Sequence, residues 1–203
     1  MKVTKFANEI DWQAARRGKI TGSRLRDIVT KRGTGKKIGF YELIAERLGL
    51  PPDEENPMER GHRLEGEAVE RFESKTGKKV LRDLVIWERE DVEGIAVSPD
   101  GWIGKKGTEA VEIKCLSSAR HIEAVITNKV PSEYWEQAIQ YFIVNDSLET
   151  LHFTFYDPRL RVKDFHVIEV TREQAKEDIE FLLNYQRETL VEVDKYVQEF
   201  TQF

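Results

Sequence analysis

The sequence predicts an α/β domain built around a mixed central β-sheet. Apolar positions recur with helical period in several segments of both halves, whereas short segments in the middle alternate with period two, as strands do. The predicted order is helices, several strands, a helix, two strands and a final helix, which suits an α/β fold. A length of 203 residues is enough for one domain with its own core, so we expect residues 1–203 to form a single domain.

The individual elements follow from periodicity and from their end signals. Helices are expected over residues 11–17, from Thr21 or Ser23 to about 31, and over 40–48, 58–76 and 131–144. A further helix or helix pair is expected from 171 to the end. Strands are expected over residues 79–88, 94–97, 109–114, 150–156 and 164–170. Gly18, Gly49 and Gly77 follow three of the helices, where glycine commonly ends a helix.

The composition excludes several classes of protein. No apolar run approaches the length of about 18 residues needed to span a bilayer, and the N-terminus lacks the apolar core of a secretory signal. The single cysteine, Cys115, excludes a disulfide framework and a cysteine-ligated cluster within one chain. The histidines lack zinc-ligand spacing and there is no phosphate-binding loop, so we expect neither zinc nor ATP. We expect a cytosolic protein.

Charge is distributed unevenly along the chain. The net charge is −5, yet residues 1–40 contain eleven Lys or Arg against three acids, which gives this part +8. Such asymmetry indicates a basic face for an anionic partner on an otherwise acidic body. A solvated, highly charged helix would produce the same pattern, and charge alone does not separate the two.

The strongest local signal joins a turn to a strand. Asp100 lies in the turn Ser-Pro-Asp-Gly, and Glu112 and Lys114 follow two positions apart in the strand predicted for 109–114. Side chains two apart share one face of a sheet. Two carboxylates supply the hard oxygens that magnesium binds, and a lysine beside them can orient or activate water or stabilise charge on a phosphate. A hairpin with a surface Glu–Lys pair is the alternative.

Two helices carry further candidates. In the helix predicted for 58–76, Glu65 falls within the arc of apolar positions, where a carboxylate is costly unless it is paired or bound to metal. It is therefore either the partner of a buried arginine or a carboxylate of a metal site. In the largely apolar helix 131–144, Gln137 and Gln140 share one side. A structural hydrogen bond, or a contact with water or phosphate, would explain a glutamine there.

These motifs together resemble a known family. Ser-Pro-Asp100-Gly followed by Glu112-Ile-Lys114 resembles the PD-(D/E)-x-K nucleases, and four more blocks in the same order resemble the phage lambda exonuclease, or YqaJ, family within them. Those blocks begin at Trp12 (WQAARRGKITGS), Arg60 (RGHRLE), Gln137 (QAIQY) and Tyr156 (YDPR). The resemblance covers roughly residues 10–170.

The resemblance implies a restriction-endonuclease-like core and a 5′-to-3′ exonuclease on linear double-stranded DNA. It implies Asp100 and Glu112 as ligands of Mg²⁺, with Mn²⁺ able to replace it, in a two-metal mechanism. Glu65 would complete the site, and Lys114 and Gln137 would position or activate the water. The 5′-phosphate would be held by Arg16, Ser23, Ser98 and Arg120.

The resemblance also implies partners and a setting. Known members are ring-shaped homotrimers that work beside a single-strand annealing protein in phage recombination, so we expect a phage or prophage protein in the bacterial cytoplasm. Two alternatives stay open at this point. One is a structure-specific or restriction-type endonuclease on the same fold, and the other is a DNA-end-binding protein without catalysis.

Overall fold

A computed structural model describes residues 7–17, 19–20, 27–28, 30, 35–52 and 55–201. The helices are α1 (Glu9–Arg16), α3 (Ile38–Arg47), α4 (Pro57–Thr76), α5 (Ser118–Thr127), the 3₁₀ helix η1 (Ser132–Tyr134), α6 (Trp135–Val144) and α7 (Lys176–Thr201). The strands are β1 (Val80–Leu81), β2 (Trp87–Glu88), β3 (Ala96–Val97), β4 (Gly101–Ile103), β5 (Glu109–Lys114), β6 (Thr150–Tyr156) and β7 (Phe165–Thr171). The helix expected from residue 21 or 23 lies largely outside the described residues.

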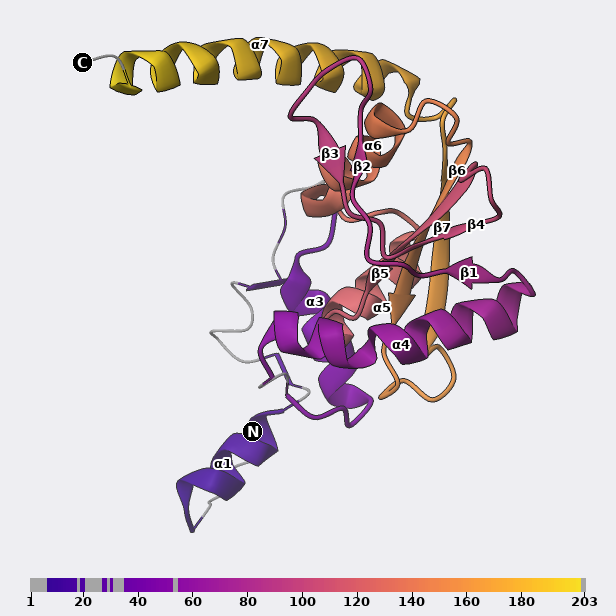
Figure 1. Ribbon diagram of the computed structural model, residues 1–203. Helices are drawn as coiled ribbons and strands as arrows, with labels where there is room; N and C mark the ends of the chain where they lie inside the picture. Colours follow the sequence, from indigo (N-terminus) through magenta and orange to yellow (C-terminus); the bar gives the residue numbers. More distant parts are fainter. Residues whose placement is uncertain are drawn as a thin grey trace.

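A five-stranded mixed sheet forms the centre of the molecule, which confirms the α/β expectation. Its strand order is β1-β4-β5-β6-β7, with β5 and β6 parallel and the other pairs antiparallel. Helix α4 covers one face and α6 the other, and α7 packs on the outside of α6 (Figure 1). None of the described helices is long and apolar enough to cross a membrane.

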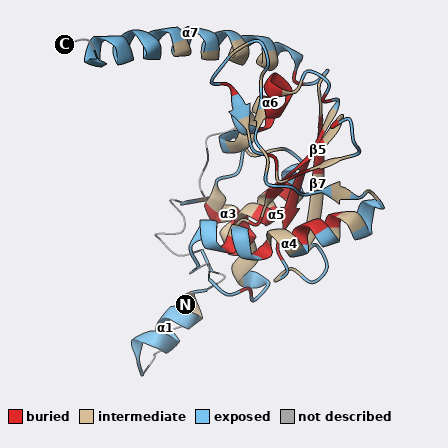
Figure 2. Cartoon of the chain, viewed as in Figure 1, coloured by how far each residue is buried: buried red, intermediate tan, exposed pale blue. Residues whose placement is uncertain are grey.

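Strand β5 divides its side chains between two cores, as its period-two pattern predicts. Val111, Ile113 and Cys115 pack with Leu64 and Phe72 of α4. Ala110 packs in the larger core on the opposite face, with residues of α6 and β6. Buried residues follow the sheet and its covering helices in Figure 2. Because Glu112 and Lys114 alternate with the α4-facing residues, they point to the α6 side.

The prediction of one continuous strand over residues 79–88 is wrong, because the structure has two short strands there. Val80 and Leu81 pair with β4 in the main sheet, whereas Trp87 and Glu88 pair with β3 in a separate two-stranded sheet. One continuous strand cannot serve both sheets at once, so residues 82–86 connect them without strand structure.

Helix α5 was not expected from the sequence. Ser117 caps it, since its hydroxyl accepts a hydrogen bond from the Arg120 backbone N–H at 3.3 Å. Ala119 and Ile122 bury the apolar side against Tyr41 of α3. Because only three residues separate the end of β5 from the start of α5, the N-terminus of α5 lies at the end of the strand that carries Lys114.

A buried ion pair fixes this end of the fold. Arg60 of α4 donates to Asp157 at 2.8 Å and to the carbonyl of Cys115 at 3.1 Å. Ser118 of α5 donates to the other oxygen of Asp157. Burial favours a higher pKa for Asp157, but the hydrogen bonds from Arg159 and Ser118 outweigh it and the pKa is lowered. The contacts join α4, α5 and the ends of β5 and β6.

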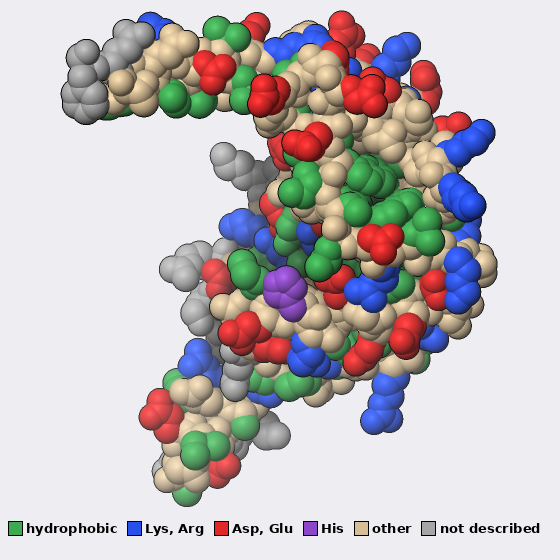
Figure 3. All heavy atoms as spheres, viewed as in Figure 1, with side chains coloured by type: hydrophobic (Ala, Val, Ile, Leu, Met, Phe, Trp, Pro, Cys, Tyr) green, Lys and Arg blue, Asp and Glu red, His purple; other side chains and the backbone are tan. Residues whose placement is uncertain are grey.

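Two helices project from this body. Helix α1 and the distal part of α7 extend on the same side, and the space-filling view is hollowed between them (Figures 1 and 3). Ile179 and Leu183 of α7 pack against the core, and Val193, Val197 and Phe200 continue their four-three spacing along the projecting part. Val193 is 47%, Val197 53% and Phe200 84% exposed, so this apolar stripe is uncovered within the chain.

Candidate active site

Asp100 and Glu112 lie side by side because of the register between β4 and β5. Gly101 is opposite Val111, so the preceding Asp100 comes next to Glu112 on the following strand. The Asp100 carboxylate accepts a hydrogen bond from the Ile113 backbone N–H at 2.6 Å. Position 101 must be glycine for this packing, because a Cβ there would lie 2.3 Å from Cγ1 of Val80 on β1.

Two side chains of helix α6 donate hydrogen bonds to Glu112. Gln137 Nε2 donates to Glu112 Oε1 at 2.7 Å, and the Tyr141 hydroxyl donates to Oε2. Residues four apart share one face of a helix, so a single helix face contacts both carboxylate oxygens. Gln140, by contrast, bonds the Ala96 carbonyl and Gln186 and has a structural role.

Tyr141 is a site residue that sequence reasoning missed, because it was counted among the apolar positions of its helix. It is fully buried, and burial together with the charges of Glu112 and Asp100 raises the pKa of its hydroxyl well above the usual value. It therefore stays a hydrogen-bond donor at neutral pH. The sequence did contain one signal for this role: Tyr141 lies four residues after Gln137 and therefore on the same helix face.

Lys114 forms an ion pair with Glu112 on the same face of β5. Its ammonium also lies 5.0 Å from the ring centre of Tyr134 and 5.9 Å from that of Phe153. The two rings attract the cation and restrict its side chain. The amine is thus directed at the carboxylates and not at open solvent.

Glu65 of α4 lies at the rim of this cluster. Its Oε1 accepts from Arg82 Nη2 at 2.9 Å, and both side chains are partly exposed. The charge of Glu65 is close enough to contribute to the raised pKa of Asp100. Glu65 is thus paired with an arginine, as one interpretation of the sequence expected, but Arg82 is 40% exposed and not buried. The assignment of Glu65 to a metal site stays a prediction.

The electrostatics show a cluster with excess negative charge. The pKa of Asp100 is raised from 3.8 to about 7, chiefly by burial and then by the charge of Glu112, against the hydrogen bond from Ile113. The neighbouring Cys115 thiol is also buried, and its pKa is raised to about 12. Lys114 only partly offsets the acids at Asp100. A cation at this point would relieve the repulsion.

The donor set fits a divalent ion that keeps much of its water. In the described part of the chain, no three side chains of His, Cys, Asp or Glu are placed to enclose an ion. Magnesium needs fewer, since one or two carboxylates with water and phosphate satisfy it. Both lone pairs of Glu112 Oε1 are used by Gln137 and Lys114, but Oε2 accepts only from Tyr141. Asp100 and Glu112 Oε2 therefore retain free acceptor capacity among the described contacts.

The described residues that were expected to hold a 5′-phosphate do not form a cluster like that of Asp100, Glu112 and Lys114. Arg120 is in the first turn of α5 and pairs with Glu123 and Glu133 at 2.8 and 3.2 Å. Ser98 is exposed two residues before Asp100. Arg16 stacks on Trp12 within α1, 4.4 Å from the ring centre, away from the sheet. Ser23 lies outside the described residues.

A family model now decides the relationship. The model of the YqaJ-like viral recombinase domain matches residues 11–147. The chain belongs to this family. The match confirms the resemblance found in the sequence, and it includes Asp100, Glu112, Lys114 and the α6 residues Gln137 and Tyr141.

Solved structures agree with the family. The chain is similar to an alkaline exonuclease from Laribacter hongkongensis, with 29% identity over 94% of this chain and 97% of that one, and a TM-score of 0.62. The same exonuclease in complex with dAMP gives 29% identity, the same coverages and a TM-score of 0.60. A phage-related exonuclease from Haemophilus somnus 129PT is more distant, at 14% identity, 84% and 94% coverage and a TM-score of 0.43. No curated protein matches.

These relationships confirm two expectations. The mixed sheet with helices on both faces is a restriction-endonuclease-like fold, and the YqaJ-like chain is an enzyme of the nuclease class.

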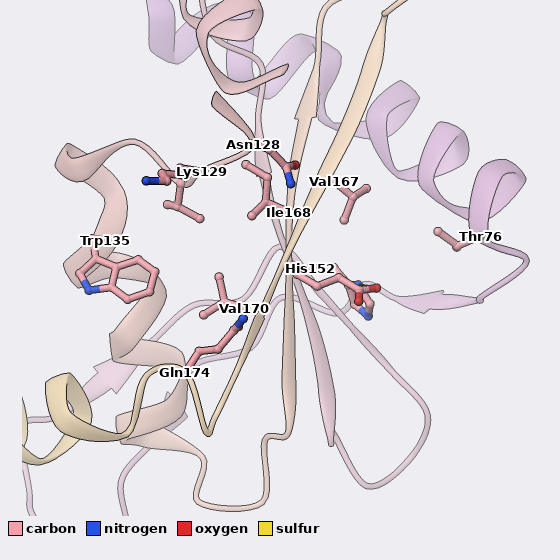
Figure 4. Close-up of a pocket in the computed structure, with 11 residues that line it drawn as sticks. Thr76, Asn128, Lys129, Trp135, His152, Val167, Ile168, Val170 and Gln174 are labelled. Atoms are coloured by element: carbon pink, nitrogen blue, oxygen red, sulfur yellow. Dashed lines mark ion pairs between the residues drawn. The ribbon is translucent and has the colours of Figure 1, made fainter. Parts of the chain in front are cut away.

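A separate cavity of about 790 Å³ runs along β7 (Figure 4). Its walls include Trp135, His152, Ile168 and Val170, and none of the predicted site residues that the structure describes lines it. The carboxylate cluster, and not this cavity, is the candidate active site.

Proposed function

We propose that this YqaJ-like nuclease is a magnesium-dependent exonuclease that degrades one strand of linear double-stranded DNA from its 5′ end. The observation that supports it best is the pairing of Asp100 and Glu112 beside Lys114, with a raised Asp100 pKa that a divalent cation would reverse. The similarity to an alkaline exonuclease supports the exonuclease class. We propose residues 1–203 as a single nuclease domain, acting in the bacterial cytoplasm.

Each side chain would have a distinct part in phosphodiester hydrolysis. Asp100 and Glu112 would hold Mg²⁺, or Mn²⁺ in its place, and Glu65 would complete a two-metal site. Bound divalent ions lower the pKa of water and neutralise charge on the leaving oxygen. Gln137 and Tyr141 fix the orientation of Glu112 through their hydrogen bonds. Lys114 would orient the attacking water and, as an ammonium, stabilise charge on the phosphate.

The test is digestion of a linear duplex labelled separately at each 5′ and 3′ end, with and without magnesium. We expect mononucleotides from the 5′-labelled end of each strand, a 3′-ended single strand as the residue, and no products without the ion. A nicked or closed circle serves as the control. Cutting of the closed circle would support the endonuclease alternative, and binding of ends without any product would support a DNA-end-binding protein.

Replacing Lys114 by alanine should slow hydrolysis by a factor of about 10² or more, the range for losing acid–base or electrostatic assistance. Duplex binding measured in calcium should weaken far less than the rate falls. A parallel fall of rate and binding would make Lys114 a DNA contact instead of a participant in the chemistry.

Recognition of the 5′ end is the second finer proposal, with Arg16, Ser23, Ser98 and Arg120 as its residues. The N-terminus of α5, which carries Arg120, suits an anion, because helix N-termini present unpaired N–H groups and a positive dipole. Arg16 lies on α1 away from this point, so the proposal requires α1 to move on DNA binding.

Arg16 can be tested by a double-mutant cycle between protein and substrate. Removing the 5′-phosphate should slow the wild type, because a terminal phosphate carries about two charges and a guanidinium binds it through two hydrogen bonds. The Arg16→Ala variant should be slow on both substrates and insensitive to the difference. A coupling below about 0.5 kcal/mol would remove Arg16 from the pocket.

We further propose a ring-shaped homotrimer that works with a single-strand annealing recombination protein. The uncovered apolar stripe on distal α7 supports self-association. Light scattering should give about 71 kDa, which is 3 × 23.7 kDa. A monomer under the conditions of the nuclease assay would contradict the ring.

A further inference from the structure

Arg82 stands at the rim of the carboxylate cluster, in the connection between the two sheets. Its Nη2 donates to Glu65 Oε1 at 2.9 Å. Its side chain lies close to Gly101, the residue after Asp100, since a Cβ built at Gly101 would be 3.8 Å from Arg82 Cγ. The preceding residue, Leu81, pairs with Trp102 of β4, and this register fixes where the arginine emerges.

The cluster thus contains three carboxylates and two cations of its own. Lys114 pairs with Glu112, and Arg82 pairs with Glu65. Asp100 has a backbone N–H from Ile113 and an ion pair with neither cation among the described contacts. The internal cations therefore neutralise the two glutamates and leave the aspartate.

The two ion pairs differ in how easily they separate. The side chains of Lys114 and Glu112 are 17% and 3% exposed, whereas those of Arg82 and Glu65 are 40% and 30% exposed. Exposed pairs contribute little, because water screens the charges and the side chains lose entropy. A dication that approaches the cluster from solvent therefore displaces Arg82 more readily than Lys114.

We propose that Arg82 is a positioning residue that acts as an exchangeable counter-ion. It holds Glu65 until a divalent cation takes that carboxylate, and its freed guanidinium then binds a DNA phosphate at the mouth of the site. This inference rests on the proposed metal-dependent function. Arg82 would therefore couple metal binding to DNA binding. Metal binding would free the guanidinium that DNA binding uses.

The substitution Arg82→Ala distinguishes this role from a structural one, because it should change Mn²⁺ binding and duplex binding in opposite directions. Mn²⁺ binding to the protein without DNA, measured by calorimetry, should tighten about threefold or more, because a competing cation of a weak exposed pair is removed. Duplex binding in calcium should weaken, and the slope of its affinity against salt should fall by about one phosphate contact. Arg82→Lys should restore much of the duplex binding.

Arg63→Ala is the matched control. Arg63 is on the same helix as Glu65 and forms an exposed ion pair with Glu55 at 2.7 Å, so its loss removes an arginine of similar exposure. We expect Mn²⁺ binding to change little in that variant. Unchanged Mn²⁺ and duplex binding in Arg82→Ala, or a weakening of both, would overturn the counter-ion role. Wild-type Mn²⁺ binding in Asp100→Ala would instead refute the metal site itself, whatever Arg82 does.

Discussion

Asp100→Ala and Glu112→Ala should each abolish hydrolysis of linear duplex DNA while the chain stays folded. Each change removes a charged oxygen ligand, and no neighbouring acid replaces it. Several kcal/mol of transition-state stabilisation depend on the bound ions, and every 1.36 kcal/mol is tenfold in rate, so we expect a loss of about 10³-fold or more. The assay is product formation at saturating magnesium, with circular dichroism to check folding.

Glu112→Gln is the stricter version of the same test. The amide keeps the size of the side chain and can still contact Gln137 and Tyr141, which now donate to both carboxylate oxygens. It supplies no negative charge to an ion, so we expect the variant to be as inactive as Glu112→Ala. Near-normal activity in any of the three variants would exclude that residue from the mechanism.

Asp100→Asn should stabilise the metal-free protein at pH 8. The pKa of Asp100 is about 7 in the folded protein, against an ordinary value of 3.8, because burial and the charge of Glu112 disfavour its ionised form. A folded-state pKa above the unfolded one means that the wild type loses stability as pH rises from about 4 to 7. The rise from 3.8 to about 7 corresponds to at most about 4 kcal/mol.

The measurement is chemical unfolding at pH 4 and at pH 8 in the presence of a chelator. Asn at position 100 should be the more stable at pH 8 and should lose most of that advantage at pH 4. Saturating magnesium should stabilise the wild type far more than Asp100→Asn, because the variant retains only one of the two proposed carboxylate ligands, Glu112. If the difference in unfolding free energy between wild type and variant were the same at both pH values, the electrostatic explanation would be wrong.

Local patterns in the sequence predicted the centre of the site. The strand 109–114 was found with its observed bounds because apolar and polar residues alternate from Val111 to Lys114. It pairs with β6 along its whole length and with β4 over residues 109–111. The same alternation placed Glu112 with Lys114 on one face. The match of this strand to family motifs then suggested the chemistry that we propose.

Other features depend on pairing between distant segments, which single-sequence patterns do not contain. The break at residues 82–86 follows from two separate sheets, and this connection is where Arg82 meets Glu65. Tyr141 was taken as apolar, because only the folded protein shows that its hydroxyl meets Glu112. Helix α5 did carry a local signal, the Ser117 cap before apolar positions at 119 and 122, and it was overlooked.

The proposed mechanism depends on binding of the catalytic metal by Asp100 and Glu112. The most direct measurement is anomalous diffraction from crystals of the wild type soaked in Mn²⁺, with Asp100→Ala crystals as the control. We expect an anomalous peak between the Asp100 carboxylate and Oε2 of Glu112 in the wild type, and its loss in the variant. A peak confined to other residues, or one that persists in Asp100→Ala, would contradict it.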